Sequence, residues 1–417
     1  MRIDSKWTLL ALFLGVLTIT GSGGVGYSWG ITPSTPSKPS VRSPAPDSGQ
    51  KDFRAYMHGI EAVKGADGRY LVFFSSSNIP PTDADHEQGN WTHDVYVSNW
   101  GSADSLISLP RIFIQKPEAQ EPASAAQTTD GHIMVSFEDG WNTPNEVSQR
   151  YGVYDSALQP IAPYPLDVAN GGHSGHVTAV GNNFVVFYSE GWIHGGGVDN
   201  LGTGDGVYAK VYDSRGQALR TIEIAPDVRE WWPMIAGSPS LALLVWQQFV
   251  PGKLYANLKI AILNPQTGAV TGQKVLQSNI QYYTYKTEYV PAIDRFIVTG
   301  TTVAGKGFAY LIGNSGQITA KLPCMPSTVR EAGITVNGAK VYTPSQDNRL
   351  LHLALTPSSI SLTAVQLSPV NWSYIGNVGL MRNSSQIHWV SLSKTGIQEA
   401  DFNVSDAKTP SAADRCQ

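Results

Sequence analysis

The chain has 417 residues and a formal net charge of −4, and only 15% of its residues are charged. Without a broad basic field it is not expected to bind nucleic acid. Its 41 glycines, 26 prolines and many aromatic residues favour short strands joined by tight turns. We therefore expect an all-β protein, which can place this length of chain in one large domain.

The N-terminus has the order of a signal peptide. Arg2 and Lys6 precede the apolar run 7–19, and small residues follow at 20–24. We predict that residues 1–25 are a signal peptide or an uncleaved anchor, and that the protein is secreted or periplasmic. Because the apolar run is short for a membrane-spanning helix, we expect no membrane span in the mature form.

Residues 26–52 are rich in proline and serine and have few large apolar side chains. Such a segment cannot bury enough surface to fold, so we predict a linker that leads into a domain at 53–417. The two cysteines, Cys324 and Cys416, fit an oxidising compartment. A disulfide between them would tie the C-terminal tail to the domain; two unpaired buried thiols are the alternative.

A turn followed by four to six mostly apolar residues recurs along the domain. The copies lie at 68–74, 131–137, 181–188, 240–246, 294–298, 338–342 and 385–390. Most copies precede an alternating strand, which is clearest at 207–212. The repeats predict a seven-bladed β-propeller of four-stranded antiparallel blades. A pair of β-sandwiches is the alternative.

The first four repeats carry the long insertions and most of the histidines. The densest polar segment begins at Gly172-His173-Ser174-Gly175-His176 and continues through His194 to Asp205. Glycines in such a segment let the backbone approach a ligand closely. We expect His173 to begin the innermost strand of a blade and His194 to follow the second strand. Both would then reach one rim of the channel, between blades 3 and 4.

This segment could also hold a metal ion. A metal could be held by His173, His194 and either Asp199 or Asp205, although the spacing matches no standard zinc pattern. The alternative is that the histidines cap turns. We predict no metal ligand, and the cofactor content stays open: a structural divalent metal is compatible with the sequence.

A glycosidase would need two carboxyl groups at one site. Glu138 or Asp139 could supply one and Glu190 the other, because they occupy equivalent positions in adjacent repeats. Acids at equivalent positions of a repeat also bond turn amides, which is the structural alternative.

Segment 172–205 resembles the polysaccharide lyases of the ulvan type, which are secreted seven-bladed propellers. That family places two histidines about 20 residues apart on one rim of its active-site canyon. Here His173 and His194 are 21 positions apart, with Glu190-Gly191-Trp192 between them. The resemblance implies β-elimination at a uronic acid. His173 would be the base, a role that suits imidazole, and His194 would orient the sugar or assist proton transfer.

In the next repeat the family has a tyrosine and, about 16 residues later, an arginine. This chain has Trp231-Trp232 and Gln247-Gln248 there, with Arg229 and Tyr255 close in sequence. We therefore add Arg229 and Tyr255 to His173 and His194 as candidate catalytic residues. The candidate substrate-binding residues are His176, Glu190, Trp192, Trp231, Trp232, Gln247 and Gln248.

The expected function is a monomeric polysaccharide lyase that cleaves an anionic, uronate-containing polysaccharide by β-elimination. The absence of the tyrosine–arginine pair favours one alternative, a carbohydrate-binding or cell-surface propeller without catalysis. A propeller glycoside hydrolase is the other.

Overall fold

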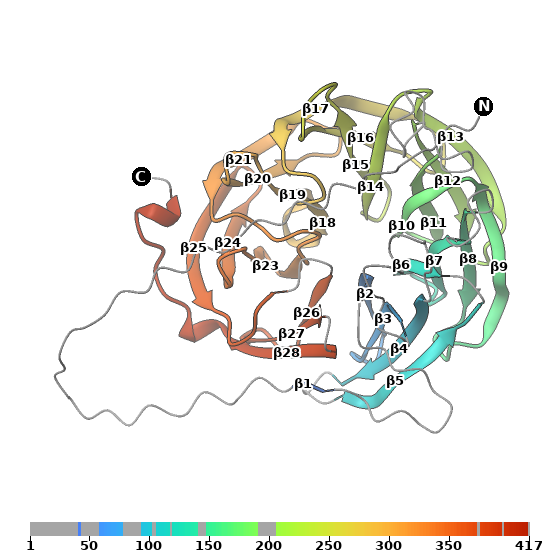
Figure 1. Ribbon diagram of the computed structural model, residues 1–417, viewed down its shortest axis with the longest axis horizontal. Helices are drawn as coiled ribbons and strands as arrows, with labels where there is room; N and C mark the ends of the chain where they lie inside the picture. Colours follow the sequence, from blue (N-terminus) through green and yellow to red (C-terminus); the bar gives the residue numbers. More distant parts are fainter. Residues whose placement is uncertain are drawn as a thin grey trace, which may run out of the picture. The chain divides into compact units, whose positions relative to one another are not determined.

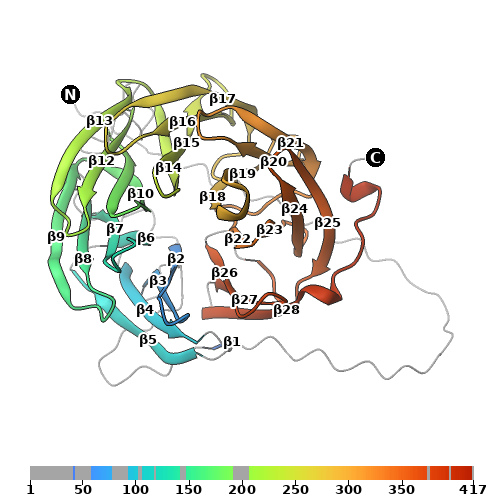
Figure 2. The ribbon, with the colours of Figure 1, turned by 180° about the vertical axis from the view of Figure 1, so that it is seen from behind.

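The computed structural model describes residues 41–42, 58–77, 93–101, 106–116, 119–140, 147–190, 206–372, 376–393 and 396–415. These residues form seven four-stranded sheets arranged around a central channel, and every strand pairs antiparallel with its neighbours (Figures 1 and 2). The predicted fold class, a seven-bladed β-propeller, is confirmed.

Each blade runs outward from an innermost strand that lines the channel (Figure 1). Blade 1 has β2 (His58–Lys64), β3 (Tyr70–Ser77), β4 (His93–Trp100) and β5 (Leu106–Ile114). Blade 2 has β6 (Gln120–Gln127), β7 (Ile133–Asp139), β8 (Ser148–Tyr154) and β9 (Pro160–Asn170). Blade 3 has β10 (His173–Val180), β11 (Asn183–Ser189), β12 (Gly206–Asp213) and β13 (Ala218–Pro226).

The remaining blades follow the same order. Blade 4 has β14 (Glu230–Gly237), β15 (Ala242–Phe249), β16 (Ala256–Leu263) and β17 (Val270–Ile280). Blade 5 has β18 (Lys286–Val290), β19 (Arg295–Thr301), β20 (Gly307–Ile312) and β21 (Ile318–Met325). Blade 6 has β22 (Thr335–Asn337), β23 (Lys340–Pro344), β24 (Arg349–Thr356) and β25 (Ser359–Leu367).

The last blade takes its outer strand from the other end of the chain. It contains β26 (Asn377–Met381), β27 (Gln386–Ser393) and β28 (Gly396–Asn403), and β1 (Val41–Arg42) pairs with β28. This pairing covers the open edge of β28 and brings the first and last strands of the described chain together in one blade. β1 lies inside the range 26–52, which the sequence predicts to be a linker.

The second strand of every blade carries the sequence repeat. The repeat copies correspond to β3, β7, β11, β15, β19, β23 and β27. These strands lie between two neighbouring blades, so both of their faces are covered, as the uninterrupted burial of β7 shows. Outer strands such as β25 alternate between buried and exposed residues, because one face meets solvent. The repeat is visible in the sequence because its strands read as continuous apolar runs.

A separate hydrophobic cluster fills each interface between blades. The cluster that closes the ring packs Phe74 and Trp100 of blade 1 against Val390 and Leu392 of blade 7. Burying a side chain of this size contributes about 1.5–3 kcal/mol. The ring is therefore held by lateral packing between blades.

Several innermost strands begin with a bulge at the same end of the channel. The pairing register shifts between His173 and His176 in β10 and between Trp231 and Met234 in β14. Ser174 and Trp232, inside these bulges, have φ of 54° and 57°. A bulge redirects the side chains around it, and left-handed non-glycine residues often occur at functional sites. This end of the channel is called the bulged rim below.

Helical structure among the described residues is limited to three short 3₁₀ turns, η1 (Pro291–Ile293), η2 (Val404–Asp406) and η3 (Ala413–Arg415). None of the described helices is long and apolar enough to cross a membrane. The predicted signal peptide or anchor at 1–25 lies outside the described residues.

The predicted disulfide stays a prediction, because Cys416 lies outside the described residues. Cys324 lies on β21, and η3, which ends one residue before Cys416, contacts β21. Changing Cys324 to serine should lower the free energy of unfolding by up to about 4–5 kcal/mol, the loop-closure value for a loop of this length. Urea unfolding measures the change. The Cys416→Ser variant should match it, and free thiols in the unreduced wild type would contradict the bridge.

Candidate functional site

His173 begins β10 at the bulged rim, as the sequence predicts. Its side chain is 6% exposed, and its Nδ1 lies 2.6 Å from the Ser174 hydroxyl oxygen. Gly175 follows in the bulge, where a Cβ would lie 2.5 Å from the amide carbon of Gln149. The Gln149 side chain accepts a hydrogen bond from the Gly175 amide at 2.9 Å. Glycine is required here because the backbone packs directly against Gln149.

A buried carboxyl group faces His173 from blade 2. Glu138, near the end of β7, has its Oε2 3.7 Å from His173 Nε2, and its Oε1 accepts a hydrogen bond from the Ser174 amide. Burial raises the pKa of Glu138 well above its ordinary value; the Ser174 amide opposes this, and the charge of Glu121 adds to it. Glu121 in turn has its Oε2 3.4 Å from Nδ1 of His93. The rim of blades 1 to 3 therefore holds a cluster of two carboxyl groups and two histidines.

Blade 4 presents unpaired donors at the same rim. Trp231 on β14 and Gln247 on β15 lie directly opposite each other and are 4% and 0% exposed. Neither Trp231 Nε1 nor Gln247 Nε2 finds a hydrogen-bond acceptor among the described residues. Gln247 is held in place by its Oε1, which accepts a hydrogen bond from the Tyr283 amide at 3.1 Å. Buried donors without acceptors are costly, so this pair is suited to an acceptor supplied by a ligand.

Arginine side chains stack on aromatic rings beside these donors. The Arg229 guanidinium lies 4.9 Å from the Phe249 ring centroid and 5.5 Å from that of Trp231. Arg330, before β22, lies 4.4 Å from the centre of the Tyr283 ring. Its Nε already donates to Glu331 at 2.9 Å, so Arg229 is the candidate arginine for an anion contact. Stacking keeps the planar guanidinium next to the ring, while the N–H groups at the edge of the guanidinium can bind an anion. The rim of blades 4 and 5 thus combines aromatic surface, positive charge and N–H donors.

Gln248, another candidate, makes different contacts. Gln248 donates to Glu230 at 3.0 Å, and Lys259 also binds Glu230, so Gln248 belongs to a buried charge network. Glu190 follows β11, and Tyr255 precedes β16 and is half-buried. The structure brings Arg229, Trp231, Trp232 and Gln247 together in one cluster. His194 and Trp192 lie outside the described residues.

His176 lies on a different surface from His173. The bulge places it on a small cavity inside the channel, which it lines with Lys286 and Glu331. Burial lowers the pKa of His176 to about 4, and the positive charge of Lys286 acts in the same direction. His176 is therefore neutral at neutral pH.

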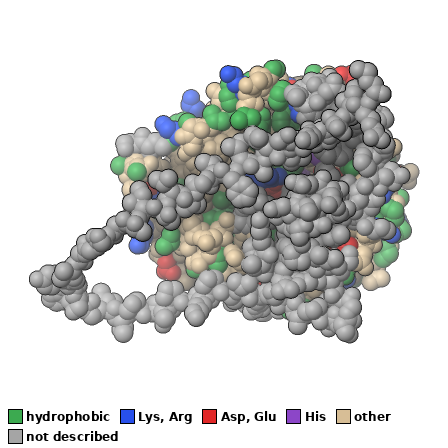
Figure 3. Space-filling view, viewed as in Figure 1, with side chains coloured by type: hydrophobic (Ala, Val, Ile, Leu, Met, Phe, Trp, Pro, Cys, Tyr) green, Lys and Arg blue, Asp and Glu red, His purple; other side chains and the backbone are tan. Residues whose placement is uncertain are grey.

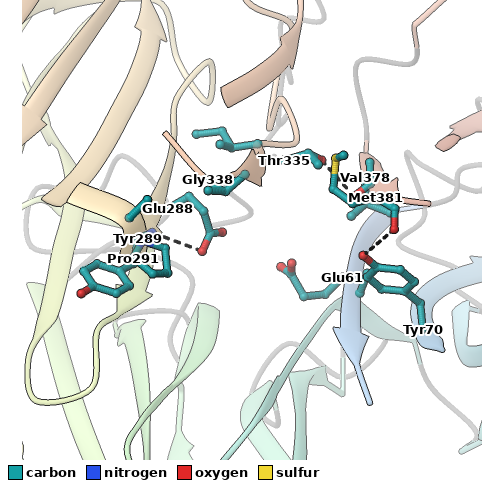
Figure 4. Close-up of a pocket in the computed structure, with 14 residues that line it drawn as sticks. Glu61, Tyr70, Glu288, Tyr289, Pro291, Thr335, Gly338, Val378 and Met381 are labelled. Carbon is teal, nitrogen blue, oxygen red and sulfur yellow. Dashed lines mark hydrogen bonds between the residues drawn. The ribbon is translucent and has the colours of Figure 1, made fainter. Parts of the chain in front are cut away.

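The opposite mouth of the channel opens into a cavity of about 530 Å³, lined by blades 1, 5, 6 and 7. Glu61 and Glu288 point their carboxyl groups into it from opposite sides (Figure 4). Lys286 Nζ lies 3.3 Å from Glu61 Oε2. Burial raises the pKa of Glu288 to about 7, with a further contribution from the charge of Glu61. Figure 3 shows the face of the ring that Figure 1 views, where basic and acidic side chains lie next to each other near the middle.

No group of histidine, cysteine, aspartate and glutamate side chains suited to a metal occurs among the described residues. Three members of the hypothesised metal site, His194, Asp199 and Asp205, lie outside them. The metal hypothesis is therefore untested. The hydrolytic pair of Glu138 and Glu190 likewise stays a hypothesis.

The sequence analysis did not single out Glu121, which faces Glu138, or Glu61 and Glu288, the two acids of the cavity at the opposite mouth of the channel. Glu121, Glu61 and Glu288 lie in strands whose sequence shows no motif. Their alternation with small or apolar residues could have placed them on the channel-facing side of innermost strands. Nothing in the sequence alone could show which acids face each other across the ring.

No family model and no curated relative matches the sequence. Among solved structures, the chain is similar to the BP39L lectin from Burkholderia pseudomallei, with a TM-score of 0.55 and 13% identity, covering 86% of this chain and 98% of the lectin. It is also similar to an α-L-arabinanase from Penicillium chrysogenum, with a TM-score of 0.50 and 9% identity over 89% and 99% of the two chains.

An ulvan lyase of the PL25 family has a TM-score of 0.49 and 10% identity over 88% of this chain and 99% of that one. Likenesses at these identities reach the fold alone, so the lyase resemblance of segment 172–205 is not settled by them. The comparisons agree with the strand pairing: this chain has the β-propeller fold.

Proposed function

We propose that the chain is an exported, glycan-active propeller that cleaves a uronate-containing anionic polysaccharide by β-elimination at the bulged rim. The observation that carries this proposal is the buried donor pair of Trp231 and Gln247, which finds no acceptor among the described residues and lies beside the stacked Arg229 guanidinium. β14, which carries Trp231, packs against β10, which begins with His173. A candidate base and a candidate anion site thus lie on adjacent strands.

The chemistry assigns a role to each group. His173 takes the proton from the carbon beside the uronate carboxylate, and the electron pair forms a carbon–carbon double bond. The glycosidic oxygen leaves from the next carbon and takes a proton from an acid or water. Trp231, Gln247 and the Arg229 guanidinium stabilise the charge on the carboxylate, which grows as the proton leaves. A lectin and an arabinanase have propellers of similar fold, which supports a glycan as the ligand class.

Carbohydrate binding without catalysis is the second candidate. It is favoured by the burial of His173, which leaves little of the imidazole accessible. Both functions use the same donors, and only the lyase produces an unsaturated uronate.

The proposal is tested with Trp231→Phe, which removes the indole N–H and keeps an aromatic ring. Losing a hydrogen bond to a charged group should weaken binding of a polyuronate by about tenfold or more, measured by isothermal titration calorimetry. Cleavage is followed by the ultraviolet absorbance of the unsaturated product.

Trp372→Phe is the matched control, because Trp372 also has an indole N–H without an acceptor among the described residues but lies in the interface of blades 6 and 7. It should bind like the wild type. Equal affinity of Trp231→Phe and the wild type would refute the anion site. Binding without any absorbance change would leave the carbohydrate-binding candidate.

A further inference from the structure

Two carboxyl groups face each other across the first two strands of blade 2. Glu121 on β6 and Glu138 on β7 are directly opposite in the strand register, and they are 9% and 1% exposed. Side chains opposite each other in an antiparallel pair lie on the same face with Cβ atoms about 4.5–5.5 Å apart. Two carboxyl groups that are this close together and this deeply buried cannot both ionise readily.

The hydrogen-bond partners distinguish the two acids. Glu138 Oε1 accepts the Ser174 amide, whereas Oε2 has no hydrogen-bond partner among the described residues. The imidazole of His173 lies 3.7 Å from that oxygen. Glu121 instead has its Oε2 3.4 Å from Nδ1 of His93, and it is the more exposed of the two acids. Glu138 is more deeply buried and has one oxygen without a partner among the described residues, so it is the acid better suited to hold a proton.

The other charged groups that the structure describes on β7 and β8 beside Glu138 are already paired. Asp139, the next residue of β7, binds the Arg150 guanidinium at 2.7 Å. Arg150 also binds Asp167 at 2.9 Å. Arg150 is therefore not available to Glu138, and burial together with the charge of Glu121 raises the pKa of Glu138 well above its ordinary value.

We infer that Glu138 is a positioning residue that remains a neutral carboxylic acid beside His173 and thereby keeps the imidazole unprotonated. This inference rests on the proposed role of His173 as a base. An ionised carboxylate at 3.7 Å would stabilise the imidazolium form and occupy the nitrogen that must accept a proton. A neutral acid at the same place fills the space beside the ring without the negative charge that would favour the imidazolium form.

The inference is tested by following the His173 ring by ¹⁵N NMR as pH is varied. In Glu138→Gln, whose amide imitates the neutral acid, the His173 titration should move by less than about half a pH unit. In Glu121→Gln, Glu138 loses the nearby negative charge and ionises more easily, so the His173 pKa should rise by about one unit. Glu223→Gln, on the exposed outer strand β13, is the control and should change nothing.

Infrared spectroscopy gives a second readout that needs no activity. Because Glu288 also keeps part of its proton at neutral pH, the measurement is made in a Glu288→Gln background. This protein should show the carbonyl band of a protonated carboxylic acid, and adding Glu138→Gln should remove the band. A fall of one unit or more in the His173 pKa of Glu138→Gln, or no such band in the Glu288→Gln protein, would overturn the inference. If no polyuronate is cleaved while both readouts hold, the proposed lyase activity fails and the protonation of Glu138 stands.

Discussion

Replacing His173 with alanine is expected to reduce cleavage of a polyuronate by about 10²–10⁴-fold, the usual contribution of a positioned general base. The proton beside a uronate carboxylate is weakly acidic, so its removal needs a base at hydrogen-bond distance. His173 begins β10 at the bulged rim, and β10 packs against the strand that carries Trp231. The initial rate of absorbance increase measures the effect.

The effect of His173→Ala should fall on kcat, because the imidazole acts on the reacting carbon, and polyuronate affinity should stay within a few-fold of the wild type. His132→Ala is the control: His132 lies on the turn before β7, where its Nδ1 is 2.9 Å from the Ser214 carbonyl oxygen. It should keep full activity. A His173→Ala variant as active as the wild type would exclude His173 as the base.

The ring could be predicted from the sequence because its second strands are buried on both faces. Runs such as 131–137 and 181–188 are apolar without interruption, and this signal does not depend on the partner strand. The strand β1 could not be predicted in the same way. Val41–Arg42 is a two-residue strand inside a proline- and serine-rich segment, and its pairing with β28 is decided by ring closure.

Those parts of the site that depend only on the order of strands along the chain could be predicted from the sequence. The position of His173 follows from counting strands within a repeat, and the grouping of Trp231 with Gln247 follows from hairpin register. The separation of His173 from His176 depends on the bulge between them, which moves His176 to the inner cavity. No sequence period encodes such a bulge. The contact of Glu138 with His173 joins two blades and depends on how they pack.

Replacing Glu288 with glutamine is expected to stabilise the protein above neutral pH. The folded state holds the Glu288 proton with a pKa of about 7, compared with the ordinary 4.5, because of burial and the charge of Glu61. A raised carboxyl pKa means that the folded state binds the proton more tightly than the unfolded chain. Stability therefore falls as pH rises from about 4.5 to about 7, and the loss is complete above that range.

A shift from 4.5 to about 7 corresponds to roughly 3.5 kcal/mol at most, at about 1.4 kcal/mol per pKa unit. Glutamine has no proton to lose, so Glu288→Gln should gain about 1–3 kcal/mol over the wild type at about pH 8 and little at about pH 4. Urea unfolding at a series of pH values measures this difference. Glu223→Gln, on the exposed strand β13, should show no such trend.

The sign of the stability change in Glu288→Gln shows whether burial or the charge of Lys286 dominates in the cavity at the opposite mouth of the channel. Lys286 lies two residues before Glu288 on β18 and already pairs with Glu61 at 3.3 Å. If the attraction of Lys286 exceeded the cost of burial, ionised Glu288 would be stabilising, and glutamine would weaken the fold at high pH. Glu61 makes the direct contact with Lys286, and Glu288 faces Glu61 across a cavity of about 530 Å³. The Glu288 carboxylate therefore lacks a full counter-charge, and Glu288 is more stable in the protonated form.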